Sequence, residues 1–187
     1  MRSDRKGKSG EREVCKLLML WWTPHYPGSV FVKTPGSGGW GGASRFHAQV
    51  KSDMRASGDV MTTLDAFPFS VEVKREQHWS PDRMLFGRPS PVWTWWIQAQ
   101  TQACKDYLIP MLWFRRNREP WWVLLPVEYA KRYPLPPPMQ SWSRGTLLGV
   151  DHGALVPVLY EATVLMTVNP TIFEGQNEAE VMAQDSP

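Results

Sequence analysis

The sequence has few of the features that mark secreted, zinc-stabilised or membrane proteins. Only two cysteines, Cys15 and Cys104, occur in 187 residues, and neither belongs to a CxxC pair or a His/Cys cluster. This scarcity argues against a disulfide scaffold or a structural zinc site and indicates a reducing compartment. The longest apolar runs, residues 17–22 and 121–127, are far too short to span a bilayer. The charged N-terminus leads into no long apolar stretch, so we expect no signal peptide, no membrane partner and a cytoplasmic protein.

An excess of one charge is also missing, since the formal net charge is only +3. That value alone does not identify a nucleic-acid-binding protein. The charge is unevenly distributed, however: residues 1–90 carry 14 Lys/Arg against 9 Asp/Glu, whereas residues 91–187 carry 7 against 9. The basic first half is therefore where we expect a polyanion to bind.

Tryptophan, by contrast, is abundant. The chain has 11 tryptophans within an otherwise ordinary composition of 42% hydrophobic and 21% charged residues. Most of them fall in expected helices or strands, where they are predicted to pack in the core or in a dimer interface. Trp40 and Trp79 lie in expected loops instead, and either could stack on an unpaired base.

Hydrophobic periodicity and turn residues predict alternating helices and strands. Ser9 is expected to cap a first helix over residues 9–22, and Ser90, followed by Pro91, to cap a second that ends near Tyr107. The remaining expected elements are a strand at 29–34, a long loop at 35–58, an antiparallel strand pair at 109–114 and 121–125, a short helix at 126–133, an extended linker at 133–139, a hairpin of 146–150 with 154–160, and a disordered acidic tail from 174.

A hairpin is predicted between residues 58–64 and 69–76, about a turn at residues 65–66. In this register Val60 lies opposite Val71, and one side of the hairpin is apolar. Residues of the other side are polar, because side chains alternate with period two along a strand.

Two carboxylates and a lysine are expected to meet on that polar side. Asp59 falls opposite Glu72, and Lys74 shares the face of Glu72 at a spacing of about 6–7 Å. Carboxylate oxygens suit Mg²⁺ or Mn²⁺ better than zinc, and such an ion can activate water for attack on a phosphodiester. Lys74 could orient that water or stabilise developing charge. Alternatively Glu72 and Lys74 form an exposed charged strand face, the interpretation that spacing alone favours.

Glu11 shifts the balance towards a functional site. It lies on the helical line of Val14 and Leu18, the stripe that is predicted to pack on the rest of the fold. A carboxylate at the mouth of an apolar stripe needs a partner, which could be a metal site, a salt bridge or the start of the helix. Glu13 flanks the stripe and is expected to be solvated.

The order of these motifs resembles a known enzyme group. The segments KGKSGEREVCKLL, SVFVKT with PGSGG, SGDV and VEVKR are similar to archaeal-type Holliday junction resolvases of the PD-(D/E)xK nuclease superfamily, and above all to phage-borne members. A helix glutamate, a hairpin aspartate and an E-x-K strand form the active site of that group. Their counterparts here are Glu11, Asp59, Glu72 and Lys74, and the resemblance covers roughly residues 5–125.

The resemblance implies an α/β fold with a restriction-endonuclease-like core, in which helices flank a central mixed sheet. We expect the nuclease core in residues 1–132. The residue pattern, and not the resemblance, predicts a linker and β-rich hairpin extension packed on the core (133–173) and the acidic tail (174–187). The resemblance also implies a homodimer that resolves four-way DNA junctions by paired nicks, using Mg²⁺ or, as a substitute, Mn²⁺. The metal is expected on Asp59, Glu72 and the Val73 backbone carbonyl, with Glu11 acting through water.

Contacts with DNA are expected mainly from the basic half of the chain. Ser37 matches a loop serine that contacts the substrate backbone in the resolvases. The other expected DNA-binding residues are Lys6, Lys8, Arg12, Arg45, Lys51, Arg55 and Arg75. The basic turn at 115–118 could bind phosphate or simply be solvated. Gln98 or Gln102 could reach the active site, as a helix glutamine does in several relatives, or form a plain polar helix face.

Two alternative functions stay open at this point. One is a phage recombination or replication nuclease that cuts forks, flaps or single strands. The other is a non-cutting DNA-binding protein on the same fold, although the intact set of four residues speaks against it.

Overall fold

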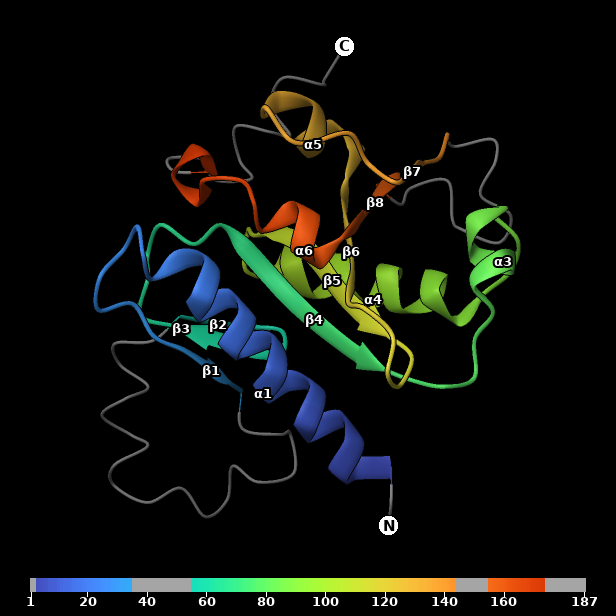
Figure 1. The fold of residues 1–187 in the computed structure, drawn as a ribbon, viewed down its shortest axis with the longest axis horizontal. Coiled ribbons are helices and arrows are strands. Elements are labelled where there is room, and N and C mark those ends of the chain that lie inside the picture. Colours follow the sequence, from blue (N-terminus) through green and yellow to red (C-terminus); the bar gives the residue numbers. More distant parts are fainter. Residues whose placement is uncertain (1–2, 35–54, 144–154, 174–187) are drawn as a thin grey trace.

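A computed structural model describes residues 3–34, 55–143 and 155–173 (Figure 1). Within them, five strands form a central sheet in the order β4-β5-β6-β8-β7, and three short strands form a separate antiparallel sheet in the order β1-β3-β2. The central strands are β4 (Phe69–Arg75), β5 (Ile109–Arg115), β6 (Trp122–Pro126), β8 (Pro157–Glu161) and β7 (Gln140–Ser141). The short strands are β1 (Phe31–Lys33), β3 (Val60–Thr62) and β2 (Arg55–Ser57).

The central sheet is mixed, because β4 and β5 run parallel while the other neighbours are antiparallel. Parallel neighbours need a long crossover connection. Here the connection contains the short helix α3 (Pro81–Leu85) and the helix α4 (Pro91–Lys105). The expected mixed sheet flanked by helices is therefore confirmed.

Helices cover both faces of the central sheet. Figure 1 shows α1 (Ser3–Trp22) crossing one face beside β4, with α4 on the opposite face. The alternation of side chains divides the core accordingly: Val71 and Val73 pack with residues of α1, whereas Leu112 and Phe114 pack with residues of α4. The remaining helices are α5 (Val127–Arg132), α6 (Ala162–Leu165) and the 3-10 helix η3 (Pro170–Phe173).

Several locally encoded elements match the sequence prediction. Ser90 caps α4 by accepting from the Val92 amide, and Pro91 opens the helix. The strands β5 and β6 pair antiparallel as expected, and α5 occupies the predicted short helix. None of the helices in the described ranges combines the length and the apolar character needed to cross a membrane.

Two predictions about the first half of the chain are wrong. The first helix begins at Ser3 rather than after a cap at Ser9, because the apolar stripe marks the buried part of a helix and not its polar first turns. Part of the predicted long loop forms β2, while residues 35–54 lie outside the described residues.

The predicted hairpin is also wrong. The strand β3 pairs with β1 and β2, and β4 pairs with β5, so Val60 and Val71 belong to different sheets. The link between the two sheets is a single parallel bridge from Gly58 to Val71. Alternation defines the faces of a strand but not its partner, and β4 is buried along Phe69–Val73 because helices cover both its faces.

The C-terminal part adds strands to the same sheet. The strand β8 lies between β6 and β7, so the observed partner of β8 on its outer side comes from residues 140–141. The first arm and the turn of the hairpin predicted at 146–160, and the tail from 174, lie outside the described residues.

Candidate active site

Asp59 is held against the open edge of β4 by its own backbone and side chain. Its amide donates to the Val71 carbonyl oxygen (2.7 Å), and its Oδ2 accepts from the Val73 amide (2.8 Å). Its carbonyl oxygen accepts from the Thr34 amide (2.9 Å) at the end of β1. Asp59 thus bonds to backbone groups on the free edge of β4, and these bonds fix its position beside Val71 and Val73.

Gly58 makes this close approach possible. It has φ +69°, a left-handed conformation that favours glycine. A Cβ atom at this position would lie 2.3 Å from the Val71 carbonyl oxygen, far closer than a real contact. Any side chain here would push Asp59 away from β4.

Glu72 and Lys74 project from β4 on the α4 side of the sheet. Lys74 Nζ lies 2.6 Å from Glu72 Oε1, and Gln98 Nε2 of α4 donates to the same oxygen at 2.8 Å. Glu72 is only 6% exposed. A buried carboxylate needs charged or hydrogen-bonding partners, which Lys74 and Gln98 provide here.

Glu11 approaches from α1. Its Oε2 lies 3.8 Å from Lys33 Nζ of β1, and its side chain is 21% exposed. The negative charge of Glu11 contributes to raising the pKa of Glu72, as expected for a third carboxylate near the site. Cys15, one helical turn further along α1, also lies near these carboxylates. Burial and then the charges of Glu11 and Asp59 raise the pKa of its thiol to about 12.

The site disfavours two negative charges in the absence of a cation. Burial is the main cause that raises the pKa of Asp59, and the Val73 amide, Lys74 and Lys33 counteract it. Burial also raises the pKa of Glu72, followed by repulsion from Asp59. The carboxylates are therefore close enough to interact, and an added positive charge would relieve both effects.

This arrangement fits a hydrated divalent ion better than a complete protein cage. Within residues 3–34, 55–143 and 155–173, no three His, Cys, Asp or Glu side chains meet closely enough to hold a metal alone. Magnesium ions are typically bound through one or two carboxylates and keep several waters. Asp59 and Glu72 supply two carboxylates. The Val73 carbonyl lies on the same strand edge as the Val73 amide that Asp59 binds, because both groups of one residue project to the same side.

The predicted helix glutamines differ in position. Gln98 reaches Glu72, whereas Gln102 Nε2 bonds to Asp106 Oδ2 (3.4 Å) within the same helix region. The sequence left both choices open, because residues four apart lie on one helix face and only the packing angle of α4 decides which one reaches β4.

Trp79 corrects a prediction. Its side chain is 6% exposed, its ring packs on Phe114 at 5.3 Å, and its indole nitrogen donates to the Glu76 carbonyl. Its ring is part of the core and is not presented to a base, because a loop that crosses an apolar sheet face can bury its large side chains.

The expected DNA-binding residues are only partly described. Arg12 is exposed on α1. Arg75 is half-buried and bonds to Asn117 Oδ1 (3.0 Å) and Ser9 Oγ (3.3 Å), so it joins α1, β4 and the turn after β5. Lys6, Lys8 and Arg55 lie on α1 and β2, with no side-chain placement described; Ser37, Trp40, Arg45 and Lys51 lie outside the described residues.

The sequence interpretation missed several supporting residues. Glu13 is bonded rather than merely solvated, since it accepts from Arg115 and from the Trp121 indole nitrogen (3.3 Å). Lys33 faces Glu11, which its place on an alternating strand could have suggested. Gly58, directly before Asp59, could have indicated that the chain approaches another backbone closely at this point.

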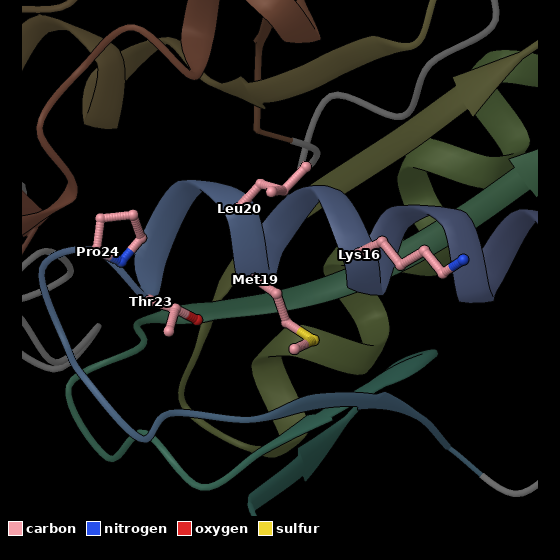
Figure 2. A pocket seen from close by; sticks show the side chains of 5 residues that line it. All are labelled: Lys16, Met19, Leu20, Thr23 and Pro24. Atoms are coloured by element: carbon pink, nitrogen blue, oxygen red, sulfur yellow. The ribbon is translucent and has the colours of Figure 1, made fainter.

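A hollow of about 600 Å³ lies away from these carboxylates, on the exposed side of α1. Figure 2 shows its lining, in which Met19 and Thr23 point to one side of α1 and Leu20 to the other. The lining residues are Lys16, Met19, Leu20, Thr23 and Pro24. None of the candidate active-site residues belongs to it.

Comparison with known proteins places the chain in a nuclease family. Residues 2–135 match the family described as "Phage putative PDDEXK endonuclease". A solved structure, that of the Holliday junction resolvase Hjc from the archaeal hyperthermophile Archaeoglobus fulgidus, aligns over 90% of this chain and 94% of its own. The identity in that alignment is 16% and the TM-score is 0.31, a distant similarity from which no role is transferred. No curated protein matches the sequence. The family match extends over most of the chain, and the protein therefore belongs to the phage PD-(D/E)xK endonuclease family.

Proposed function

We propose that this nuclease is a Mg²⁺-dependent endonuclease that nicks branched DNA, with four-way junctions as its substrate. The observation that carries the proposal is the meeting of Asp59, Glu72 and Lys74 at the open edge of β4, with Glu11 beside them. A buried carboxylate, Glu72, beside a half-buried one, Asp59, is a poor arrangement for stability, and groups with such perturbed pKa values concentrate at functional sites.

Asp59, Glu72 and the Val73 carbonyl are the groups that would hold the ion, with Glu11 acting through a bound water. When bound, Mg²⁺ or Mn²⁺ polarises the phosphoryl oxygen and lowers the pKa of an attacking water. The protein's own contribution is position: the Val73 amide fixes Asp59, and Lys74 and Gln98 fix Glu72 through the same oxygen, Oε1. Neither of those contacts to Glu72 uses its Oε2.

Lys74 has a second role in this proposal. Its side chain is 23% exposed, so it is open enough to meet a substrate while it stays paired with Glu72. A positive charge here stabilises the negative charge that develops on the phosphate oxygens during attack. It can also orient the attacking water by donating a hydrogen bond.

Branched DNA is the proposed substrate because of the resemblance of the ordered motif to junction resolvases. A homodimer would present two such sites and nick two opposed strands. The basic first half of the chain supplies the charge needed to bind the phosphate backbone, and binding should weaken steeply with salt.

The test is incubation of the folded protein with Mg²⁺ on a four-way junction and on a linear duplex of the same sequence. We expect paired nicks in the junction, none without a divalent ion, and none from Lys74→Ala. Efficient cutting of a flap with an intact junction would support a fork or flap nuclease instead. Failure of folded wild type to cut any DNA with Mg²⁺ or Mn²⁺, combined with junction binding equal to that of Lys74→Ala, would support a binding protein without catalysis.

A further inference from the structure

The connection after β4 places one large aromatic side chain in solvent. Phe86, which ends α3, is 74% exposed, whereas its neighbours Trp79 and Met84 are 6% and 2% exposed. Trp79, the other large aromatic side chain of this connection, and Met84 are thus part of the core, whereas Phe86 points away from it.

The turn that carries Phe86 is firmly held. Its amide donates to the Asp82 carbonyl (3.0 Å), and the amide of Gly87, at φ +63°, donates to the Met84 carbonyl (2.9 Å). Two buried indoles secure the flanks: Trp142 Nε1 donates to the Leu85 carbonyl (3.3 Å), and Trp93 Nε1 donates to the Arg88 carbonyl (2.8 Å). A fixed backbone presents the exposed ring in one place, which lowers the entropy cost of binding to it.

Two arginines of the same turn, Arg83 and Arg88, lie on either side of Phe86 along the chain. The Arg88 amide donates to the Arg83 carbonyl (2.8 Å), so the two residues meet at the base of the turn with Phe86 between them. Both are exposed, and neither forms an ion pair within the described residues. The acidic neighbour, Asp82, lies in the first turn of α3, where it complements the helix dipole. An aromatic surface between two cations suits a base with its adjacent phosphates.

The turn lies on the α4 side of the sheet, as do Glu72 and Lys74. The helix α4 follows it directly and carries Gln98, which contacts Glu72. Pro91 and Gln98 are seven residues apart, about 10 Å along the helix axis. Since successive phosphates on one strand of duplex DNA are about 3.4 Å apart along the axis, a strand cut at Glu72 could reach the turn within several nucleotides.

We propose that Phe86 stacks on a base exposed at the branch point of the DNA substrate, while Arg83 and Arg88 bind the flanking phosphates. This inference rests on the proposed function, and it names the structural feature of the substrate that the enzyme recognises. A continuous duplex stacks all its bases internally, so the contact discriminates branched from linear DNA.

The test compares Phe86→Ala with Tyr107→Ala by fluorescence anisotropy on four-way junction and linear duplex, without a divalent ion. Tyr107 is a matched control, because it is 71% exposed at the other end of the same helix region. We expect Phe86→Ala to bind the junction about tenfold more weakly, with its affinity for duplex and its melting temperature unchanged. Phe86→Trp should retain junction affinity, and Tyr107→Ala should change neither affinity.

A fluorescent base analogue at the branch point locates the contact. Its emission should change when wild type binds and not when Phe86→Ala binds. Equal junction affinity of Phe86→Ala and wild type, or an equal loss on junction and duplex, would overturn the stacking contact while leaving the proposed function intact. A changed oligomeric state of Phe86→Ala in gel filtration would overturn it as well, since Phe86 would then contact a second copy. Wild type that neither binds nor cuts junctions would instead defeat the proposed function itself.

Discussion

The neighbouring strands β4 and β5 have the same length and pair in parallel over seven residues, yet their side chains have different roles. On the α4 side of the sheet, Glu72 of β4 lies beside Leu112 of β5, and Lys74 lies beside Phe114. Both Leu112 and Phe114 are fully buried. The interior strand is thus built for packing, whereas the edge strand bears charged groups whose burial costs stability.

The difference teaches how such a site is made. An interior strand has no free edge, so an aspartate could not bind along it as Asp59 does along β4. The edge position leaves the Val71 carbonyl and the Val73 amide available, and Gly58 lets the chain approach them. Proteins commonly accept lower stability at sites that must function.

Removal of charge from β4 should have the largest effect on activity. Glu72→Gln keeps the size and the hydrogen-bonding capacity of the side chain but removes its charge. We expect cleavage of a four-way junction with Mg²⁺ to fall by at least about 100-fold. Circular dichroism should show an unchanged fold. Retained cleavage by this variant would contradict the assignment of Glu72.

The corresponding change in β5 should affect stability instead. Leu112→Ala opens a cavity in the core on the α4 side and should lower the free energy of unfolding by about 2–5 kcal/mol, measured by urea denaturation. Cleavage per folded molecule should stay within a few-fold of wild type below the unfolding transition. If Leu112→Ala abolished cleavage while fully folded, the functional contrast between the two strands would disappear.

Gly58→Ala should lower both cleavage activity and stability. The new Cβ would meet the Val71 carbonyl oxygen, and the left-handed backbone would be strained by at least about 1 kcal/mol. Asp59 would move from β4, so we expect cleavage to fall at least about tenfold at a modest cost in melting temperature. As a control, Gly28→Ala tests a left-handed glycine with open space around it, where only stability should change.

The start of α4 could be predicted from the sequence, whereas the pairing partner of β4 could not. The Ser90 cap and Pro91 are local signals, and α4 begins where they predict. The partner of β4 depends on tertiary packing, so the predicted hairpin was wrong even though it brought Asp59 close to Glu72. The E-x-K spacing placed Glu72 and Lys74 on one face, which period-two alternation guarantees.

Exposure was harder to predict than position in the sequence. Trp79 and Phe86 both lie in the connection between β4 and α4, and of these two only Trp79 is predicted from the sequence as a ring that could stack on a base, because of its place in an expected loop. The structure buries Trp79 against Phe114 and exposes Phe86, because the direction of a loop across the sheet decides which side chains face inward. Local patterns do not contain that direction.

The smallest expected effect concerns pH and metal. Because burial raises the pKa of Asp59 and Glu72 above their ordinary values of 3.8 and 4.5, the folded protein binds protons more tightly than the unfolded chain. The metal-free protein should therefore lose stability as the pH rises from these ordinary values through the raised pKa range.

Asp59→Asn removes one of the charges and should raise the metal-free melting temperature at pH 7.5 by a few degrees, about 2–4 °C for each kcal/mol. This advantage over wild type should shrink as the pH falls below the raised pKa range. Added Mg²⁺ should stabilise wild type more than the variant. Differential scanning calorimetry checks both expectations, and equal Mg²⁺ shifts for the two proteins would count against a metal at Asp59.

The central claim is that Asp59 and Glu72 form a divalent-cation site on the edge of β4. Crystals soaked in Mn²⁺ and measured at the manganese absorption edge test it most directly. The account predicts an anomalous peak bound by Asp59, Glu72 and the Val73 carbonyl, and no peak there in Asp59→Asn. A well-ordered site without such a peak, or a peak bound by other residues, would contradict it.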